Sequence, residues 1–291
     1  MQAVKTGLAA LLALSLGACS GSSMSLPGTA TALPQEEPGQ TAAAPAAPAI
    51  AAATPAPVPE PVAPAPQPAA ATPKKPAEWA ALFVAGDDSI KVFDNATRRF
   101  YSILDNKPDV NLRRLTSDPS IAPSAEDVAD TGTIDQSLGF ITKSQQEKCL
   151  VFMTSHGTKD GFYLSRANGS GGLLPPDILD HWLDNYCGLR PTVVIVSACY
   201  SGIFLEQGMA QPNRIILTAA RADRPSFGCG AGETYTYYDK CLLDSWTWVY
   251  TWQELFDRTK ACVAEREAEL GARPSEPQAY FGPEVADLKM P

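Results

Sequence analysis

Two short apolar runs constrain the fold of this chain more than any other feature. Residues 192–197 contain four consecutive β-branched aliphatic residues and lead into Cys199, while residues 149–155 lead into His156. Runs of this length are too short for helices, and because both faces are apolar they are typical of strands inside a parallel sheet. Cys199 and His156 therefore each follow a predicted buried strand.

The segment between the two runs predicts a connecting helix. Residues 175–186 carry apolar side chains at helical spacing and begin with two prolines, which suit a first turn. A strand, a helix and a strand form a crossover unit, and such units connect parallel neighbours. The carboxyl ends of the two strands then share one edge of the sheet, where open α/β sheets bind ligands. We therefore expect His156 and Cys199 to lie next to each other.

Further strands and helices alternate along the chain, which predicts an α/β fold with a mostly parallel central sheet flanked by helices. Residues 77–291 have the length of one domain. We expect exposed loops at 117–130 and 168–172 and a Pro-rich tail after residue 270. The other expected elements are strands at 79–85, 110–115, 162–165 (one arm of a hairpin) and 214–220, and helices at 92–104, 133–146, 203–209, 235–250 and 252–270.

The first 76 residues are not predicted to be globular. Residues 1–18 have a basic start and a short apolar run, typical of a secretory signal peptide. The tetrapeptide that ends in Cys19 (Leu-Gly-Ala-Cys) resembles the lipobox of bacterial lipoproteins, which implies a lipidated Cys19 in the bacterial cell envelope. By the same analogy Ser20 favours the outer membrane, with the domain in the periplasm or at the cell surface. The simpler alternative is an ordinary signal cut after Ala18.

The segment 19–76 has the composition of a disordered tether. It is rich in Ala, Pro, Thr and Ser, holds fourteen of the 26 prolines and has almost no large apolar residue, which argues against a packed core. Alternating Ala and Pro favours an extended polyproline II conformation. We expect this segment to connect a membrane anchor at Cys19 to the folded domain.

The formal net charge of −9 falls entirely on the domain, because three Lys and three Glu balance before residue 77. An acidic surface argues against nucleic acid and against an anionic membrane surface as partners. A basic substrate would suit this charge, although solubility explains it equally well. The oligomeric state stays open.

The seven cysteines divide by expected role. With Cys19 assigned to lipid and Cys199 to chemistry, five cysteines are left, and an exported chain can form disulfides. A bond between Cys229 and Cys241 would close a plausible loop, and an odd number leaves at least one thiol unpaired or paired between chains. No CxxC motif occurs and no Cys/His cluster has metal-ligand spacing, so we expect neither a metal nor a cofactor. The five are Cys149, Cys187, Cys229, Cys241 and Cys262.

A cysteine beside a histidine has a specific chemical use. A thiol becomes an effective nucleophile when a neighbouring imidazole takes its proton. The pattern predicts Cys199 as nucleophile, His156 as general base and acid, and the N–H groups of Gly157 and Cys199 as donors to a developing oxyanion. Each residue alone has a simpler interpretation, an inert buried cysteine and a strand-end histidine. His181, in the predicted crossover helix, is interpreted as structural.

Two motifs resemble those of a known family. Residues 154–157 (Thr-Ser-His-Gly) and 197–202 (Ser-Ala-Cys-Tyr-Ser-Gly) resemble the His-Gly and Ala-Cys-x-Ser-Gly blocks of the legumain (asparaginyl endopeptidase) family of cysteine peptidases. Residues 217–229 and 236–239 resemble two further blocks, so the resemblance covers roughly residues 79–260. It implies a caspase-like three-layer sandwich, with His156 as general base and Cys199 as nucleophile. No third residue that orients the imidazole is required in that family.

The resemblance also implies that Ser226 and Asp239 line the primary specificity pocket. Ser197 stands where eukaryotic legumains carry a glutamate, and Asp87 and Asp88 lie in the loop where they carry an arginine. All five are candidate substrate-binding residues. A pocket that keeps an acid but lacks the arginine would accept Arg or Lys rather than Asn. The alternative for each of the three aspartates is a solvated loop carboxylate.

These expectations describe an exported cysteine endopeptidase that cleaves a peptide or protein substrate through a thioester acyl-enzyme. Capture of the same intermediate by an amine would give transpeptidation. The alternative from another class is a non-catalytic, caspase-like binding lipoprotein in a cell-envelope complex. A thiol-redox lipoprotein is disfavoured by the absence of CxxC.

Overall fold

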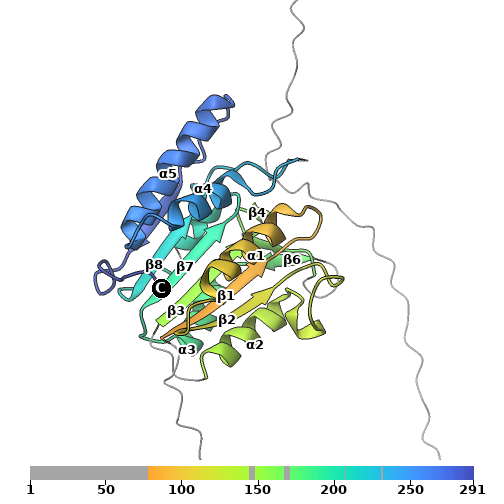
Figure 1. The fold of residues 1–291 in the computed structure, drawn as a ribbon, viewed down its shortest axis with the longest axis vertical. Helices are drawn as coiled ribbons and strands as arrows, with labels where there is room; N and C mark the ends of the chain where they lie inside the picture. Colours follow the sequence, from red (N-terminus) through yellow and green to blue (C-terminus); the bar gives the residue numbers. More distant parts are fainter. Residues whose placement is uncertain (1–77, 144–147, 167–170, 207, 231) are drawn as a thin grey trace, which may run out of the picture. The chain divides into compact units, whose positions relative to one another are not determined.

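The computed structural model describes residues 78–143, 148–166, 171–206, 208–230 and 232–291. The predicted signal peptide and tether, and residues 168–170 of the predicted Gly/Ser loop, lie outside these ranges. A six-stranded sheet in the order β2-β1-β3-β7-β8-β9 forms the centre of the fold (Figure 1). The strands are β1 Trp79–Ala85, β2 Val110–Leu115, β3 Lys148–Thr154, β7 Thr192–Ser197, β8 Arg214–Thr218 and β9 Gln278–Phe281. The first five are parallel, which confirms the predicted sheet, and β9 runs antiparallel to β8.

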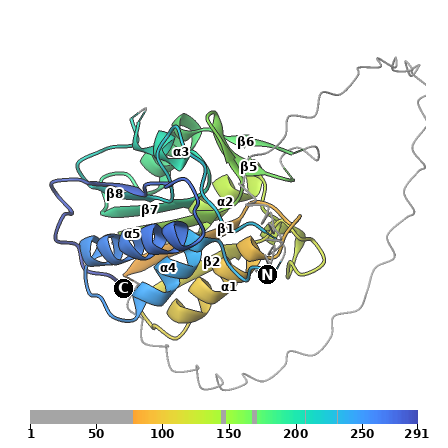
Figure 2. The same cartoon turned by 90° about the horizontal axis from the view of Figure 1, so that it is seen from above.

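Helices cover both faces of this sheet. Figure 2 shows α1, α4 and α5 on one side and α3 on the other. The helix bounds are α1 Val92–Leu104, α2 Thr131–Ile141, α3 Pro176–Tyr186, α4 Tyr237–Trp246 and α5 Trp252–Glu269. The predicted three-layer α/β architecture is confirmed.

The side-chain alternation of β1 explains why the sheet needs two helical layers. Every residue of β1 is buried. Ala81 and Phe83 pack in the core beneath α1, α4 and α5, whereas Leu82 and Val84 pack in the core beneath α2 and α3. Successive side chains of a strand point to opposite faces, so a strand that is apolar at every position must be covered twice.

A small antiparallel sheet follows directly after β3. It contains β4 (Gly157–Thr158), β5 (Gly161–Leu164) and β6 (Gly172–Leu174) in that order. The hairpin arm expected at residues 162–165 is therefore confirmed as part of β5. Because β4 begins one residue after His156, this sheet holds the end of β3 in place.

Several boundaries differ from the sequence-based expectation. The helix expected at 203–209 is the short 3₁₀ helix η3 at Ser201–Leu205, because the chain must turn within a few residues after β7. The loop at 117–130 contains a 3₁₀ turn at Ala125–Asp127. Helix α2 begins two residues earlier than expected, after a capping box in which Asp130 and Thr133 bond each other's backbone N–H. Strand β9 lies in the predicted Pro-rich tail, where no strand was expected.

Disulfides between described residues connect elements that are distant in sequence. Cys149 of β3 bonds Cys187 at the end of α3, and Cys241 of α4 bonds Cys262 of α5. The pairing of Cys229 with Cys241 is therefore wrong, because α4 presents Cys241 to the neighbouring α5. No helix in the described part of the chain is long and apolar enough to cross a membrane.

Candidate active site

The register of three neighbouring strands places the candidate residues at one edge of the sheet. Ala85 of β1 is paired with Thr154 of β3, and Thr154 is paired with Ser197 of β7. Hydrogen bonds continue past this row, because Gly86 N–H donates to the Thr154 carbonyl at 3.0 Å and Ser155 N–H donates to the Ser197 carbonyl at 3.1 Å. The segments that follow β1, β3 and β7 therefore leave the sheet at the same level.

Each of these segments carries one candidate residue two positions after the paired row of Ala85, Thr154 and Ser197. The three are Asp87, His156 and Cys199. His156 and Cys199 were predicted at neighbouring strand ends, and the parallel pairing of β3 and β7 gives this arrangement. Asp87, which was assigned to the substrate pocket, occupies the equivalent position on the other side of His156.

The imidazole of His156 is held between one carboxylate and two aromatic rings. Its Nε2 lies 3.4 Å from Oδ2 of Asp87. The ring of Phe93, near the start of α1, meets it edge-on with centroids 5.2 Å apart, and the ring of Tyr163 lies 6.4 Å away. The side chain is 23% exposed, although Nδ1 is buried and has no hydrogen-bond partner among the described residues.

Asp87 is a buried carboxylate, so the alternative of a solvated loop carboxylate is wrong for this residue. It is 5% exposed, and besides His156 it accepts a hydrogen bond from the Ser89 hydroxyl. Burial by itself would raise the pKa of Asp87, but the hydrogen bonds from His156 and Ser89 outweigh it, so the pKa lies below its ordinary value. Asp87 is therefore an anion at neutral pH.

Cys199 is buried, with 1% of the residue exposed. The backbone N–H of Ser226 donates to its Sγ at 3.3 Å, and the thiol approaches the Ser226 carbonyl at 3.5 Å and its hydroxyl at 3.7 Å. Ser226 was predicted to line the specificity pocket, and it lies directly against the sulfur. In this structure the Cys199 sulfur is therefore shielded from solvent.

Gly157 and the Cys199 backbone approach each other so closely that no side chain fits between them. A Cβ on Gly157 would stand 2.2 Å from the Cys199 carbonyl oxygen and 2.9 Å from Cβ of Ala198. The next residue, Tyr200, has φ 58° and donates its N–H to the Arg224 carbonyl at 2.8 Å. A left-handed residue at this point turns the chain sharply away from β7, which leaves Cys199 at the sheet edge.

Asp239 lies at the start of α4, beneath the ends of β3 and β7, and is 0% exposed. Its Oδ2 accepts a hydrogen bond from the Thr154 hydroxyl at 2.7 Å. Burial raises the pKa of Asp239 to about 6, and the hydroxyls of Thr154, Ser197 and Thr236 oppose that rise. The structure thus brings together Ser197 and Asp239, two of the predicted pocket residues.

Thr154 and Thr236 complete this polar cluster and were not predicted. The Ser197 hydroxyl lies 3.4 Å from that of Thr236, which caps α4 by accepting the Asp239 N–H at 3.0 Å. Two signals in the sequence point to them. A threonine ends an otherwise apolar strand opposite Ser197, and a threonine three residues before an aspartate is typical of a helix N-cap.

Asp88 is directed to a different partner. Its carboxylate forms an ion pair with Arg166 and accepts the Ser165 hydroxyl at 3.2 Å. It therefore joins the loop after β1 to the end of β5, and the structure shows no contact between Asp88 and His156, Cys199 or Asp239 among its described interactions.

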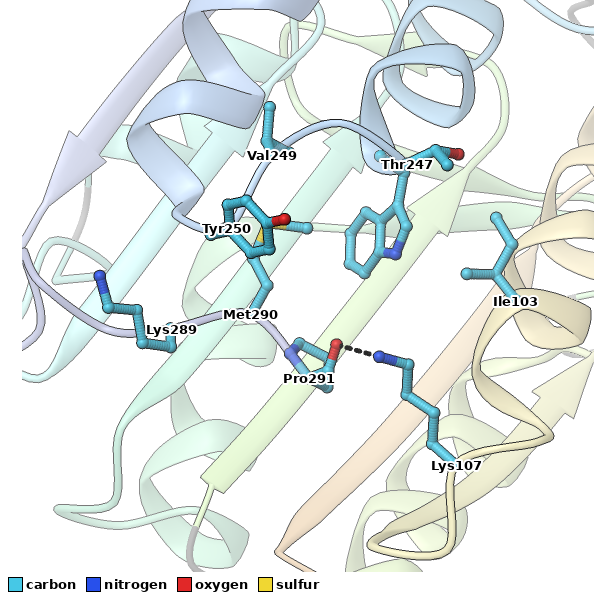
Figure 3. Close-up of a pocket in the computed structure, with 9 residues that line it drawn as sticks. Ile103, Lys107, Thr247, Val249, Tyr250, Lys289, Met290 and Pro291 are labelled. Carbon is cyan, nitrogen blue, oxygen red and sulfur yellow. Dashed lines mark hydrogen bonds between the residues drawn. The ribbon is translucent and has the colours of Figure 1, made fainter.

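A cavity of about 540 Å³ lies away from these residues (Figure 3). Its lining includes Ile103 at the end of α1 and Trp246 at the end of α4. Trp246 packs on Trp252, which packs on Trp79 at the start of β1, so the cavity is at the edge where the strands begin. It contains none of the predicted site residues.

The chain is similar to one protein-family model and to solved structures of other proteins. The model of the peptidase C13 family matches residues 128–282, just over half of the chain. Protein GSU0716 from Geobacter sulfurreducens is 11% identical with a TM-score of 0.51, over 74% of this chain and 97% of that one. Pro-sf-caspase-1 is 13% identical with a TM-score of 0.48, over 72% of this chain and 92% of that one. At such identities the likeness concerns the fold alone. No curated protein matches.

The matched region contains β3, β7 and β8 and the residues His156, Cys199, Ser226 and Asp239, whereas Asp87 precedes it. The resemblance to the legumain family is thereby confirmed, and the match supports a function of the cysteine peptidase type. The chain belongs to the peptidase C13 family.

Proposed function

We propose that this protein is a cysteine endopeptidase in which Cys199 is the nucleophile and His156 is the general base and acid. Membership of the peptidase C13 family supports the reaction class. The observation that carries the assignment of residues is the register of β3 and β7, in which Thr154 is paired with Ser197 and the two candidates follow by the same two residues.

The proposed reaction begins when the imidazole of His156 takes the proton of the Cys199 thiol. The thiolate adds to the carbonyl carbon of the scissile bond, and the N–H groups of Gly157 and Cys199 stabilise the oxyanion, a contribution of several kcal/mol in comparable sites (about 3–4). The imidazolium then gives its proton to the leaving amine, the C–N bond breaks, and a thioester is left on Cys199.

Hydrolysis of the thioester completes the cycle. Water adds to the thioester carbonyl as His156 takes its proton, and the proton returns to sulfur as the C–S bond breaks. An amine in place of water would form a new peptide bond, so the same residues would support transpeptidation.

Substrate entry requires a change of conformation. Cys199 is 1% exposed and in contact with Ser226, so a peptide reaches the sulfur only after the segments around it, Ser226 among them, separate. The backbone N–H and carbonyl of Ser226, which contact the sulfur in this structure, would then be available to hydrogen-bond the substrate backbone. Ser197 and Asp239 lie beneath this point and would contact the side chain before the scissile bond.

We further propose that the enzyme is exported to the bacterial cell envelope and held there by lipid on Cys19, in the outer membrane rather than the inner. This proposal depends on residues 1–76 of the sequence. Mass spectrometry of the mature amino terminus tests the lipid anchor, because a lipidated Cys19 and an unmodified terminus differ by the mass of the acyl groups.

Covalent labelling with an acyloxymethyl ketone peptide tests the catalytic assignment. We expect the full chain to be labelled at Cys199 and to cleave members of a peptide library, and we expect Cys199→Ala to lose both properties. His156→Gln should lose cleavage, whereas His181→Gln, which changes the other histidine of the chain on the exposed side of α3, should keep it. Labelling of Cys199→Ala at the wild-type level, or wild-type cleavage by His156→Gln, would rule out the assignment.

A further inference from the structure

Asp87 extends the pair of candidate catalytic residues into a row of three. The strands β1, β3 and β7 are consecutive in the sheet, and Asp87, His156 and Cys199 each stand two residues past the paired row at their ends. The order across the sheet is carboxylate, imidazole, thiol. A base that is held on its far side by a third group is the arrangement that activates nucleophiles in many unrelated enzymes.

The contacts of Asp87 are those of a fixed acceptor. Its side chain is buried, the Ser89 hydroxyl donates to Oδ2, and Nε2 of His156 lies 3.4 Å from the same oxygen. The neighbouring Asp88 is drawn away by Arg166. Since these hydrogen bonds keep the pKa of Asp87 below its ordinary value despite burial, the carboxylate can only accept protons in hydrogen bonds.

An anionic acceptor at Nε2 determines which nitrogen of the neutral ring carries the proton. A neutral imidazole has one N–H and one lone pair, so a proton directed at Asp87 from Nε2 leaves the lone pair on Nδ1. Nδ1 of His156 is buried and has no hydrogen-bond partner among the described residues. The rings of Phe93 and Tyr163 pack against the imidazole and restrict its rotation.

We propose that Asp87 is a positioning residue that holds His156 as the Nε2–H tautomer, so that Nδ1 takes the proton of the Cys199 thiol. This inference rests on the proposed peptidase function and deepens it. The proton passes from Sγ to Nδ1 and later from Nδ1 to the leaving amine, while Asp87 stays ionised throughout and stabilises the imidazolium. Asp87 precedes the region that matches the family model and touches no reacting atom.

The tautomer can be measured directly, because the chain has only two histidines. The full chain is prepared with ¹⁵N-labelled histidine and His181→Gln, so that the His156 ring gives the only histidine signals in a long-range ¹H–¹⁵N correlation spectrum. At a pH at which the ring is neutral, we expect the proton on Nε2. In Asp87→Asn the amide can donate to Nε2, so we expect the proton to move to Nδ1 or to distribute over both nitrogens.

The kinetic effect is measured in parallel. A ring protonated at Nδ1 cannot accept the thiol proton, so Asp87→Asn should lower kcat and the rate of Cys199 labelling by roughly 10²–10⁴-fold, with KM little changed. The matched control is Asp94→Asn. Asp94 is 5% exposed, as is Asp87, but it pairs with Arg98 and Arg114 in place of a histidine. It should lose stability and keep both the tautomer and kcat.

The outcomes separate this inference from the proposed function. A proton on Nδ1 in the wild-type ring, or an unchanged tautomer and kcat in Asp87→Asn, would overturn the role of Asp87. A wild-type Nε2–H tautomer that Asp87→Asn abolishes supports that role, even in a chain that cleaves no peptide. In that last case the failure belongs to the proposed function.

Discussion

Asp239 offers the most quantitative prediction of the structure, because its carboxyl is completely buried and its pKa is raised to about 6 by that burial. The change to test is Asp239→Asn. An asparagine oxygen can still accept the Thr154 hydroxyl, and the new amide, in place of an oxygen that has no hydrogen-bond partner among the described residues, can donate toward the hydroxyl oxygens of Ser197 and Thr236. The substitution therefore removes the buried charge and keeps the shape and the Thr154 hydrogen bond.

The magnitude follows from the difference between the folded value of about 6 and the ordinary value of 3.8. The folded state binds this proton more tightly than the unfolded state, so the ionised carboxyl destabilises the fold above pH 6 and that cost fades as the pH falls toward 3.8. At about 1.4 kcal/mol per pKa unit, the cost is about 3 kcal/mol at pH 7.5 and about 1 kcal/mol at pH 4.5. Asp239→Asn should recover most of it.

Urea unfolding of the full chain at the two pH values measures this effect. We expect Asp239→Asn to raise the free energy of unfolding by about 2–3 kcal/mol at pH 7.5 and by about 1 kcal/mol or less at pH 4.5, with an unchanged urea dependence. Asp94→Asn, which removes a carboxylate paired with two arginines, should instead lower it at pH 7.5. A loss of stability in Asp239→Asn at pH 7.5, or a gain that is the same at both pH values, would refute the reasoning.

Two further predictions concern the site. Gly157→Ala should reduce the rate of cleavage at least ~100-fold and destabilise the fold, because its Cβ would stand 2.2 Å from the Cys199 carbonyl oxygen. The control is Gly132→Ala in α2, whose Cβ would lie 3.4 Å from its nearest neighbour. It should keep cleavage and leave the free energy of unfolding unchanged or raise it by about 0.5–1 kcal/mol. A peptide library should show Arg or Lys before the scissile bond at pH 8 and a weaker basic preference at pH 5, because Asp239 is protonated below about 6. A preference that does not change with pH would contradict a role of Asp239 in that pocket.

The elements that could be predicted from the sequence are those whose pattern is dictated by burial. The strands β1, β3 and β7 are continuous apolar runs, and helices α1 and α5 begin and end within a residue of their expected bounds. Strand β9 could not be predicted in the same way. Each of its four residues is only half-buried, and it is a strand because β8 offers it an unpaired edge.

The site was predictable in part for the same reason. His156 and Cys199 follow continuous strands, and a crossover helix between parallel strands leaves their carboxyl ends at one edge. The partners of the carboxylates were not predictable. Asp87 and Asp88 are adjacent in the sequence, yet the first turns inward to His156 and the second outward to Arg166.

By itself, then, the sequence determined the layered α/β architecture and the two strand ends that carry a thiol and an imidazole, because hydrophobic periodicity is a local property of the chain. Only the tertiary structure decided the disulfide pairing, the burial of Asp239 beneath the site and the contact of Asp87 with His156. The pKa of a carboxylate depends on whether water, hydroxyl groups or rings surround it. The protein groups among these neighbours come from strands and helices up to 85 residues away in the chain.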